Sequence, residues 1–239
     1  MKILFLGTGE AFSDRANTSI LVDDKLLLDC GLTTLQQLMK IKFDLDKIKA
    51  VYITHFHADH CFGLPSFLIT CGEESRESAL KIFAPSGAEE YIKNLLNLAY
   101  GKTLDDFNFR VDIHEIKEGL FNGYKFSSAP MKHSIPCMAV SIESDVDKRK
   151  LVYTGDGSPT REVINLARNS NILIAEAYRE NTGGHSSILE AAKFARESDV
   201  ERLALVHISR KEDRSGKLED AKKIFPEIIA PEDLTLITV

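Results

Sequence analysis

The feature that most constrains the fold is an alternation, along the whole chain, of short β-type runs and amphipathic helical segments. The runs are rich in Val, Ile, Leu, Phe and Tyr, as strands are, and the helical segments repeat apolar residues at three- and four-residue spacing. Many strands with helices scattered between them predict an α/β protein with two sheets in the middle and helices outside. Strands are expected at 2–6, 19–22, 25–29, 49–54, 80–84, 109–116, 124–129, 138–144, 150–154, 171–176, 202–208 and 234–239, and helices at 33–41, 87–100, 160–167, 187–198 and 217–225.

Two helix starts are marked by their capping residues. Ser158 followed by Pro159 suits an N-cap and a first helical position. Ser187 and Glu190 have the spacing of a capping box. No linker, repeat or low-complexity stretch divides the chain, so residues 1–239 are expected to form a single domain.

Composition excludes several classes of protein. Apolar residues make up 44% and charged residues 28%, which is ordinary for a globular domain. A net charge of −6 disfavours a non-specific grip on phosphate backbones, so no DNA partner is expected. No stretch is apolar enough for a signal peptide or a membrane span, which predicts a cytoplasmic protein without a membrane partner. The four cysteines show no C-x-x-C spacing and are expected to be reduced thiols: Cys30, Cys61, Cys71 and Cys137.

The opening "LGTGEAF" invites a nucleotide-binding interpretation because it follows a predicted strand. The dinucleotide fingerprint G-x-G-x-x-G is incomplete, since Phe12 stands where its last glycine should be. No helical pattern follows either, so we do not expect a Rossmann site.

The stretch "THFHADHCFG" concentrates three of the seven histidines within six residues. His55 and His57 are two apart and can approach one metal, while Asp59 and His60 can turn toward a second. Neutral imidazole and carboxylate are suitable ligands for zinc or a similar divalent ion. A solvated loop is the alternative, but such a density of histidine has little value in packing.

Three further candidates each follow a predicted strand: His133 in "MKHSIP", Asp156 in "YTGDGS" and His207 in "LVHIS". Strand ends at one edge of a sheet converge although they lie far apart in sequence. Together these residues supply what a two-metal site needs, with one carboxylate that can bridge both ions. His114 lies inside a predicted strand without a partner motif and is interpreted as an ordinary surface histidine.

These motifs resemble the metallo-β-lactamase superfamily, and most closely its branch of tRNA 3′-processing endonucleases (ribonuclease Z) and related phosphodiesterases. "LGTGEAF", "LLLDCG", "ITHFHADHCFGLP", "HSIP", "VYTGDG", "AEA", "GGHSSILEAAKFA" and "LVHIS" follow the family's order. The resemblance implies a four-layer αβ/βα sandwich with two metals at the edge between two mixed sheets. It also implies His55, His57 and His133 as ligands of one metal, Asp59, His60 and His207 as ligands of the other, Asp156 as the bridge, and Asp29 as an acid that orients a ligand histidine.

His185 in "NTGGHSSILEAA" points to phosphodiesters rather than lactams or thioesters. It stands at a predicted helix entrance, where unpaired N–H groups favour an anion. A protonated imidazole there can protonate a leaving alkoxide, and Glu176 in "IAEAY" can hold it charged. Ribonuclease Z relatives carry such a pair, so the resemblance implies a catalytic set of Asp59, His185 and Glu176.

The chain departs from the usual ribonuclease Z pattern in two places. Only "SIPCMAVSIESDVDKRKLVYTG" separates His133 from Asp156, where those enzymes insert a long arm that grips tRNA. The family's "DCGEGTQ" also appears as "DCGLTTLQ". Both changes favour a small or flexible substrate over tRNA.

The leading hypothesis is a hydrolase with two divalent ions, zinc first and Mn or Fe as alternatives. A hydroxide bridging the metals would attack a small phosphodiester, such as a cyclic nucleotide or a short oligonucleotide, with His185 as leaving-group acid. A minimal tRNA 3′ endonuclease acting on RNA is the second hypothesis. A non-catalytic metal-binding sensor of a phosphorylated ligand is the third. A homodimer is left open.

Overall fold

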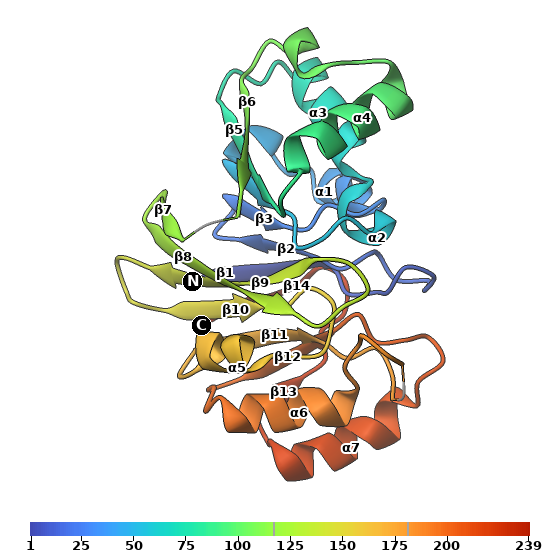
Figure 1. The fold of residues 1–239 in the computed structure, drawn as a ribbon, viewed down its shortest axis with the longest axis vertical. Helices are drawn as coiled ribbons and strands as arrows, with labels where there is room; N and C mark the ends of the chain where they lie inside the picture. Colours follow the sequence, from blue (N-terminus) through green and yellow to red (C-terminus); the bar gives the residue numbers. More distant parts are fainter. Residues whose placement is uncertain (117, 181) are drawn as a thin grey trace.

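The computed structural model describes residues 1–116, 118–180 and 182–239, and these form two seven-stranded sheets packed face to face (Figure 1). The first sheet has the order β14-β1-β2-β3-β4-β5-β6 and the second β13-β12-β11-β10-β9-β8-β7. The strands of the first are β1 (Lys2–Gly7), β2 (Ser19–Val22), β3 (Leu26–Leu28), β4 (Ala50–Tyr52), β5 (Leu80–Ala84), β6 (Val111–Glu115) and β14 (Thr235–Thr238). Those of the second are β7 (Gly119–Phe121), β8 (Tyr124–Met131), β9 (Cys137–Ser144), β10 (Lys150–Tyr153), β11 (Ile172–Glu176), β12 (Leu203–Val206) and β13 (Ile228–Ile229).

Helices cover the outer face of each sheet, which completes four layers (Figure 1). Beside the first sheet lie α1 (Thr34–Lys40), α2 (Ala58–Cys61), α3 (Leu64–Glu73) and α4 (Ala88–Tyr100), with the short 3₁₀ turns η1 (Leu45–Lys47) and η2 (Leu104–Asp106). Beside the second lie α5 (Arg161–Ala167), α6 (Ile188–Glu197) and α7 (Arg214–Ile224). The expected αβ/βα sandwich of the metallo-β-lactamase type is therefore confirmed.

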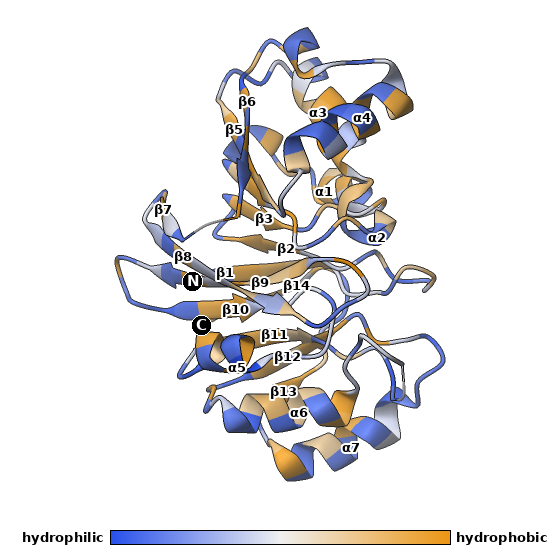
Figure 2. Cartoon of the chain, in the orientation of Figure 1, coloured by the Kyte–Doolittle hydropathy of each residue, from blue (hydrophilic) through white to orange (hydrophobic). Residues whose placement is uncertain are grey.

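Three apolar layers hold this arrangement together. The layer between the sheets joins side chains such as Ile20 and Leu28 of the first sheet to Val140 and Leu151 of the second. The other two layers lie between each sheet and its helices, so the central strands are apolar on both faces (Figure 2). This double burial explains why runs such as "NILIAE" are continuously hydrophobic instead of alternating.

The parallel strands end at a common edge of the sandwich. In the first sheet β3, β4, β5 and β6 run parallel, and in the second β10, β11, β12 and β13 do. The carboxyl ends of these strands carry the candidate residues: Asp29 after β3, His55 after β4, Asp156 after β10, Glu176 at the end of β11 and His207 after β12. Topology alone thus gathers polar residues from distant parts of the sequence.

The predictions about individual helix starts and secondary-structure elements were confirmed only in part. The capping box of Ser187 and Glu190 is confirmed at the start of α6. The N-cap of α5 is Thr160, not Ser158, because the Thr160 side chain accepts the Val163 N–H while the Ser158 hydroxyl donates to the His185 carbonyl. Six short or strongly apolar elements were not anticipated: α2, α3, η1, η2, β7 and β13. No helix in the described part of the chain is long and apolar enough to cross a membrane.

Candidate metal centre

The histidine-rich loop begins directly after β4 and continues into α2. His57 is the extended N-cap residue of this single helical turn, and Asp59 and His60 lie inside the turn, both buried. Glycine at position 31 lets the turn lie close, because a Cβ there would stand 1.9 Å from the Asp59 carbonyl oxygen. The backbone around Gly31 therefore fixes where Asp59 and His60 point.

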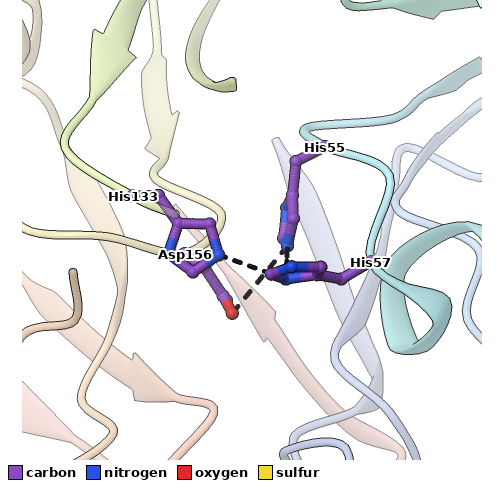
Figure 3. A group of neighbouring side chains, drawn as sticks. All are labelled: His55, His57, His133 and Asp156. Carbon is purple, nitrogen blue, oxygen red and sulfur yellow. Dashed lines mark hydrogen bonds and ion pairs between the residues drawn. The ribbon is translucent and has the colours of Figure 1, made fainter. Parts of the chain in front are cut away.

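One donor cluster consists of His55, His57, His133 and Asp156, whose donor atoms all lie within 4.8 Å of one another. Figure 3 shows the four side chains pointing toward a common centre. Nδ1 of His57 is 3.2 Å from Nε2 of His55 and 3.2 Å from Nε2 of His133. Asp156 Oδ2 lies 3.9 Å from His55 Nε2. Three imidazole nitrogens and a carboxylate oxygen are a donor set that suits zinc.

A second cluster consists of Asp59, His60 and His207, again within 4.8 Å. Asp59 Oδ2 lies 3.4 Å from His60 Nε2 and 3.1 Å from His207 Nε2. Asp156 reaches this cluster too, with Oδ1 3.3 Å from His60 Nε2 and Oδ2 3.5 Å from His207 Nε2. Asp156 thus stands between the two donor sets, where a bridging carboxylate would lie.

Buried atoms without hydrogen-bond partners show that these donors fit cations. His60 Nε2 and Asp156 Oδ1 are fully enclosed and lie 3.3 Å apart, and neither makes a hydrogen bond of good geometry. Such atoms are costly unless another group satisfies them. A divalent ion beside them would satisfy both at once, and the surrounding donors are the types that such ions prefer.

Two of the candidate ligands, His60 and His133, are held from behind by a second group. Asp29 Oδ2 lies 2.7 Å from His60 Nδ1, the contact expected of an orienting acid. The Tyr153 hydroxyl and the Thr54 N–H donate to Asp29 at 2.7 Å each. Nδ1 of His133 lies 2.7 Å from the Gly184 carbonyl. Such contacts fix which ring nitrogen would face a metal ion bound in the cluster.

Buried carboxylates set the protonation of the cluster. Burial opposes charge on His60 and on His207, yet nearby carboxylates outweigh it, raising the pKa of His60 and bringing that of His207 to about 10. Burial also opposes charge on Asp156, but His207 and His60 hold the pKa of this carboxyl well below its usual range. For His55 burial prevails and lowers the pKa. Bound cations would replace these protons.

His185 and Glu176 form a hydrogen-bonded pair beside the second cluster. His185 Nδ1 lies 2.9 Å from Glu176 Oε2, and the Glu176 side chain is buried. Burial opposes a charge on this imidazole, but the Glu176 carboxylate outweighs it and raises the pKa of His185. Glu176 Oε2 is also 3.5 Å from His207 Nδ1, a contact that the sequence did not suggest.

The N-terminus of α6 differs from the expectation of unpaired N–H groups. Ser186 N–H donates to Glu176 Oε1, Ser187 N–H to Glu190, and Glu190 N–H to the Ser187 hydroxyl. The protein's own side chains therefore occupy donors that we expected to receive a substrate anion. The helix positions His185 rather than offering these three groups to a ligand.

A cavity of about 390 Å³ opens onto both clusters. Its wall includes the candidate residues His57, Asp59, Asp156, His185 and His207. It also includes residues to which the sequence analysis gave no role in the site: Glu10, Ala11, Phe12, Leu32, Ala58 and Tyr178. The Tyr178 ring lies 4.7 Å from that of His185. His114 lies away from this cavity, exposed on β6 and stacked on Phe83, as expected of a surface histidine.

Comparison with known sequences gives one family model and many curated relatives. The model described as "Anti-Pycsar protein Apyc1" matches residues 1–225. Ribonuclease Z of Archaeoglobus fulgidus is 30% identical over 303 aligned positions, which cover 100% of this chain and 97% of the relative. Ribonuclease Z of Thermoplasma acidophilum is 32% identical over 295 positions, covering 98% and 95%.

Solved structures share the fold. The short form of human tRNase Z superimposes with a TM-score of 0.82 at 25% identity, covering 100% of this chain and 99% of that one. The metallo-β-lactamase fold protein YhfI of Bacillus subtilis gives the same TM-score of 0.82 at 22% identity, covering 99% and 98%. The second likeness shows the fold alone.

Proposed function

This chain belongs to the family of the Anti-Pycsar protein Apyc1 and, with its ribonuclease Z homologues, to the metallo-β-lactamase superfamily, and from that position we propose that it hydrolyses small or flexible phosphodiesters. It is a metal-dependent hydrolase, as its homologues show. A cyclic nucleotide or a short oligonucleotide is the proposed kind of substrate. One observation carries the proposal: a carboxylate between two donor clusters lines the same cavity as His185, which is paired with the buried acid Glu176.

We assign the ligands cluster by cluster. His55, His57 and His133 would hold one divalent ion, Asp59, His60 and His207 the other, and Asp156 would serve both. Zinc suits these donors, with Mn or Fe as alternatives. Two bound ions would supply Lewis acidity that neutralises charge on the diester oxygens and lowers the pKa of water held beside them.

His185 and Glu176 would act on the leaving group. Because Nδ1 faces Glu176, the proton available to substrate sits on Nε2 of His185. As the P–O bond breaks, this proton passes to the departing alkoxide oxygen, and Glu176 stabilises the imidazolium until then. Asp59, which lines the cavity, is the third proposed catalytic residue.

The hairpin between His133 and Asp156 supports a small substrate. Strands β9 and β10 pair antiparallel and leave only a short turn where the usual ribonuclease Z arm would lie. Lysine and acid side chains neutralise one another there, with Lys148 Nζ 3.7 Å from Asp145 and Lys150 opposite Glu143. An alignment of 303 positions against 239 residues also leaves at least 64 positions of the Archaeoglobus relative without a counterpart here.

A minimal tRNA 3′ endonuclease is the second candidate, favoured by ribonuclease Z relatives that cover nearly the whole chain. The non-catalytic sensor is set aside, because the homologues are hydrolases. A cytoplasmic location remains part of the proposal and is supported by four buried, free cysteines. The homodimer stays a prediction.

Metal analysis combined with a simple diester tests the proposal. Protein stripped with a chelator and reloaded with zinc, Mn²⁺ or Fe²⁺ should bind about two ions per chain and hydrolyse bis(p-nitrophenyl) phosphate. Asp156→Ala should lose both ions and the activity, because this carboxylate reaches both clusters. Full metal occupancy in Asp156→Ala would contradict the bridging role, and a fully loaded but inactive wild type would contradict phosphodiester hydrolysis.

A further inference from the structure

The loop after β1 presents an aromatic ring at the mouth of the metal cavity. Phe12 is 73% exposed, yet its atoms form part of the same wall as His57, Asp156 and His185. A single exposed phenylalanine is common on protein surfaces and means little alone. This one differs because it stands at the candidate reaction site and is held by neighbouring residues.

A buried carboxylate holds the backbone that carries this ring. Glu10 is only 1% exposed, and its Oε2 accepts the Phe12 backbone N–H at 2.6 Å. Its Oε1 accepts a hydrogen bond from Arg210 Nη1 at 2.8 Å. One buried side chain thus ties together the loop after β1 and the segment that follows β12, which bear Phe12 and Arg210.

The planar guanidinium of Arg210 lies over the Phe12 ring. Its guanidinium carbon lies 5.6 Å from the centre of the Phe12 ring, within range of a cation–π contact. Because Glu10 already balances the charge of Arg210, a phosphate would have to compete with that carboxylate for the guanidinium. The arrangement is better suited to a flat aromatic group than to a second anion.

We propose that Phe12, supported by Arg210 and positioned by Glu10, stacks against a nucleobase of the substrate. The inference rests on the proposed phosphodiesterase function and names the side chain that contacts the base of its nucleotide substrate. Among phosphodiesters, the flat aromatic group commonly found next to the phosphate is a base. Bases stack on aromatic side chains whatever their sequence. The cavity of about 390 Å³ is also in the size range of small-ligand pockets.

A pair of substrates with one leaving group isolates the contribution of the base. Thymidine 5′-(p-nitrophenyl phosphate) and methyl p-nitrophenyl phosphate both release p-nitrophenolate, but only the first carries a base. In zinc-loaded enzyme, Phe12→Ala should lower the ratio of their kcat/KM values by on the order of 10- to 100-fold, the scale of one stacked base. Phe12→Tyr should preserve the ratio, and so should Leu98→Ala, which removes an 86% exposed side chain from α4. An unchanged ratio in Phe12→Ala would overturn the proposal.

A binding measurement decides the matter without turnover. The sequence contains no tryptophan, so Phe12→Trp introduces a single tryptophan at the proposed contact, which can be excited selectively over the six tyrosines. Thymidine 5′-monophosphate should quench its emission, and ribose 5-phosphate should not. Leu98→Trp controls for absorption by the nucleotide. Equal responses to the two phosphates, or no response to the nucleotide, would overturn the base site.

The two experiments separate this inference from the function on which it rests. If zinc-loaded wild type cleaved neither ester, phosphodiester hydrolysis would be wrong, and the fluorescence titration would still show whether a base binds. If both esters were cleaved and the Phe12→Ala ratio did not fall, the function would stand and the base site would be wrong.

Discussion

At the scale of residues, three imidazoles of the site each have one nitrogen held by another group of the protein. His60 is fixed by Asp29, His133 by the Gly184 carbonyl and His185 by Glu176. The remaining nitrogens of His60 and His133 would face the proposed metal positions, and that of His185 would be left for substrate. Preorganisation of this kind avoids reorganisation during the reaction.

His185 should matter in proportion to how poor the leaving group is. His185→Ala should retain its metals yet lose on the order of 10²- to 10⁴-fold in kcat on dinucleotides, the usual scale for a general acid. The loss should shrink for bis(p-nitrophenyl) phosphate, whose leaving group needs no proton. His114→Ala, at an exposed histidine away from the cavity, is the matched control. Equal losses on good and poor leaving groups would point to substrate binding instead.

The cysteines should be unreactive in the folded protein. Burial raises the pKa of Cys61 and of Cys71 to about 12, and also raises that of Cys30 and Cys137. Because the thiolate is the reactive form, a raised pKa means that very little of it exists at pH 8. A thiol reagent should label none of the four at pH 8 and all of them in guanidinium. Rapid labelling of the native protein would contradict this burial.

At the scale of elements, the sequence predicted the candidate metal ligands better than it predicted the helices and hydrogen bonds around them. The ligand candidates were visible because they are polar residues at the ends of apolar strands. Helix α3 was missed because "LPSFLITCGE" is mostly apolar and shows little contrast between faces. The contacts of Thr54 and Tyr153 with Asp29 could not be predicted, since they join strands distant in sequence.

The close approach of α2 to the backbone at Gly31 gives an element-scale prediction. A methyl group at this position would overlap the Asp59 carbonyl and displace the turn that carries Asp59 and His60. Gly31→Ala should weaken zinc binding about 10- to 100-fold, as loss of support behind ligands does. Gly119→Ala is the control, since a Cβ there meets nothing within 4 Å. Competition with a chromogenic chelator measures the affinities, and circular dichroism verifies folding. Unaltered zinc affinity in Gly31→Ala would contradict the account of α2.

At the scale of the whole molecule, the four-layer fold holds the residues proposed for the reaction, and we expect segments attached to that fold, such as an arm or a hairpin, to determine which substrate binds. A precursor tRNA has to be held far from the scissile bond, normally by several Lys or Arg contacts. This chain is net acidic at −6 and has a short, charge-balanced hairpin where an arm would lie. Remote binding energy lowers the barrier for large substrates, so its absence should reduce efficiency on tRNA without altering the chemistry.

One competition assay tests this account most directly. Zinc-loaded enzyme would receive a small nucleotide diester and a precursor tRNA at matched salt, and kcat/KM would be measured for each. We expect ready hydrolysis of the small diester, poor cleavage of the tRNA, and RNA affinity that weakens further as salt rises. Cleavage of the tRNA at its 3′ boundary far more efficiently than any small diester would contradict the account and favour the endonuclease.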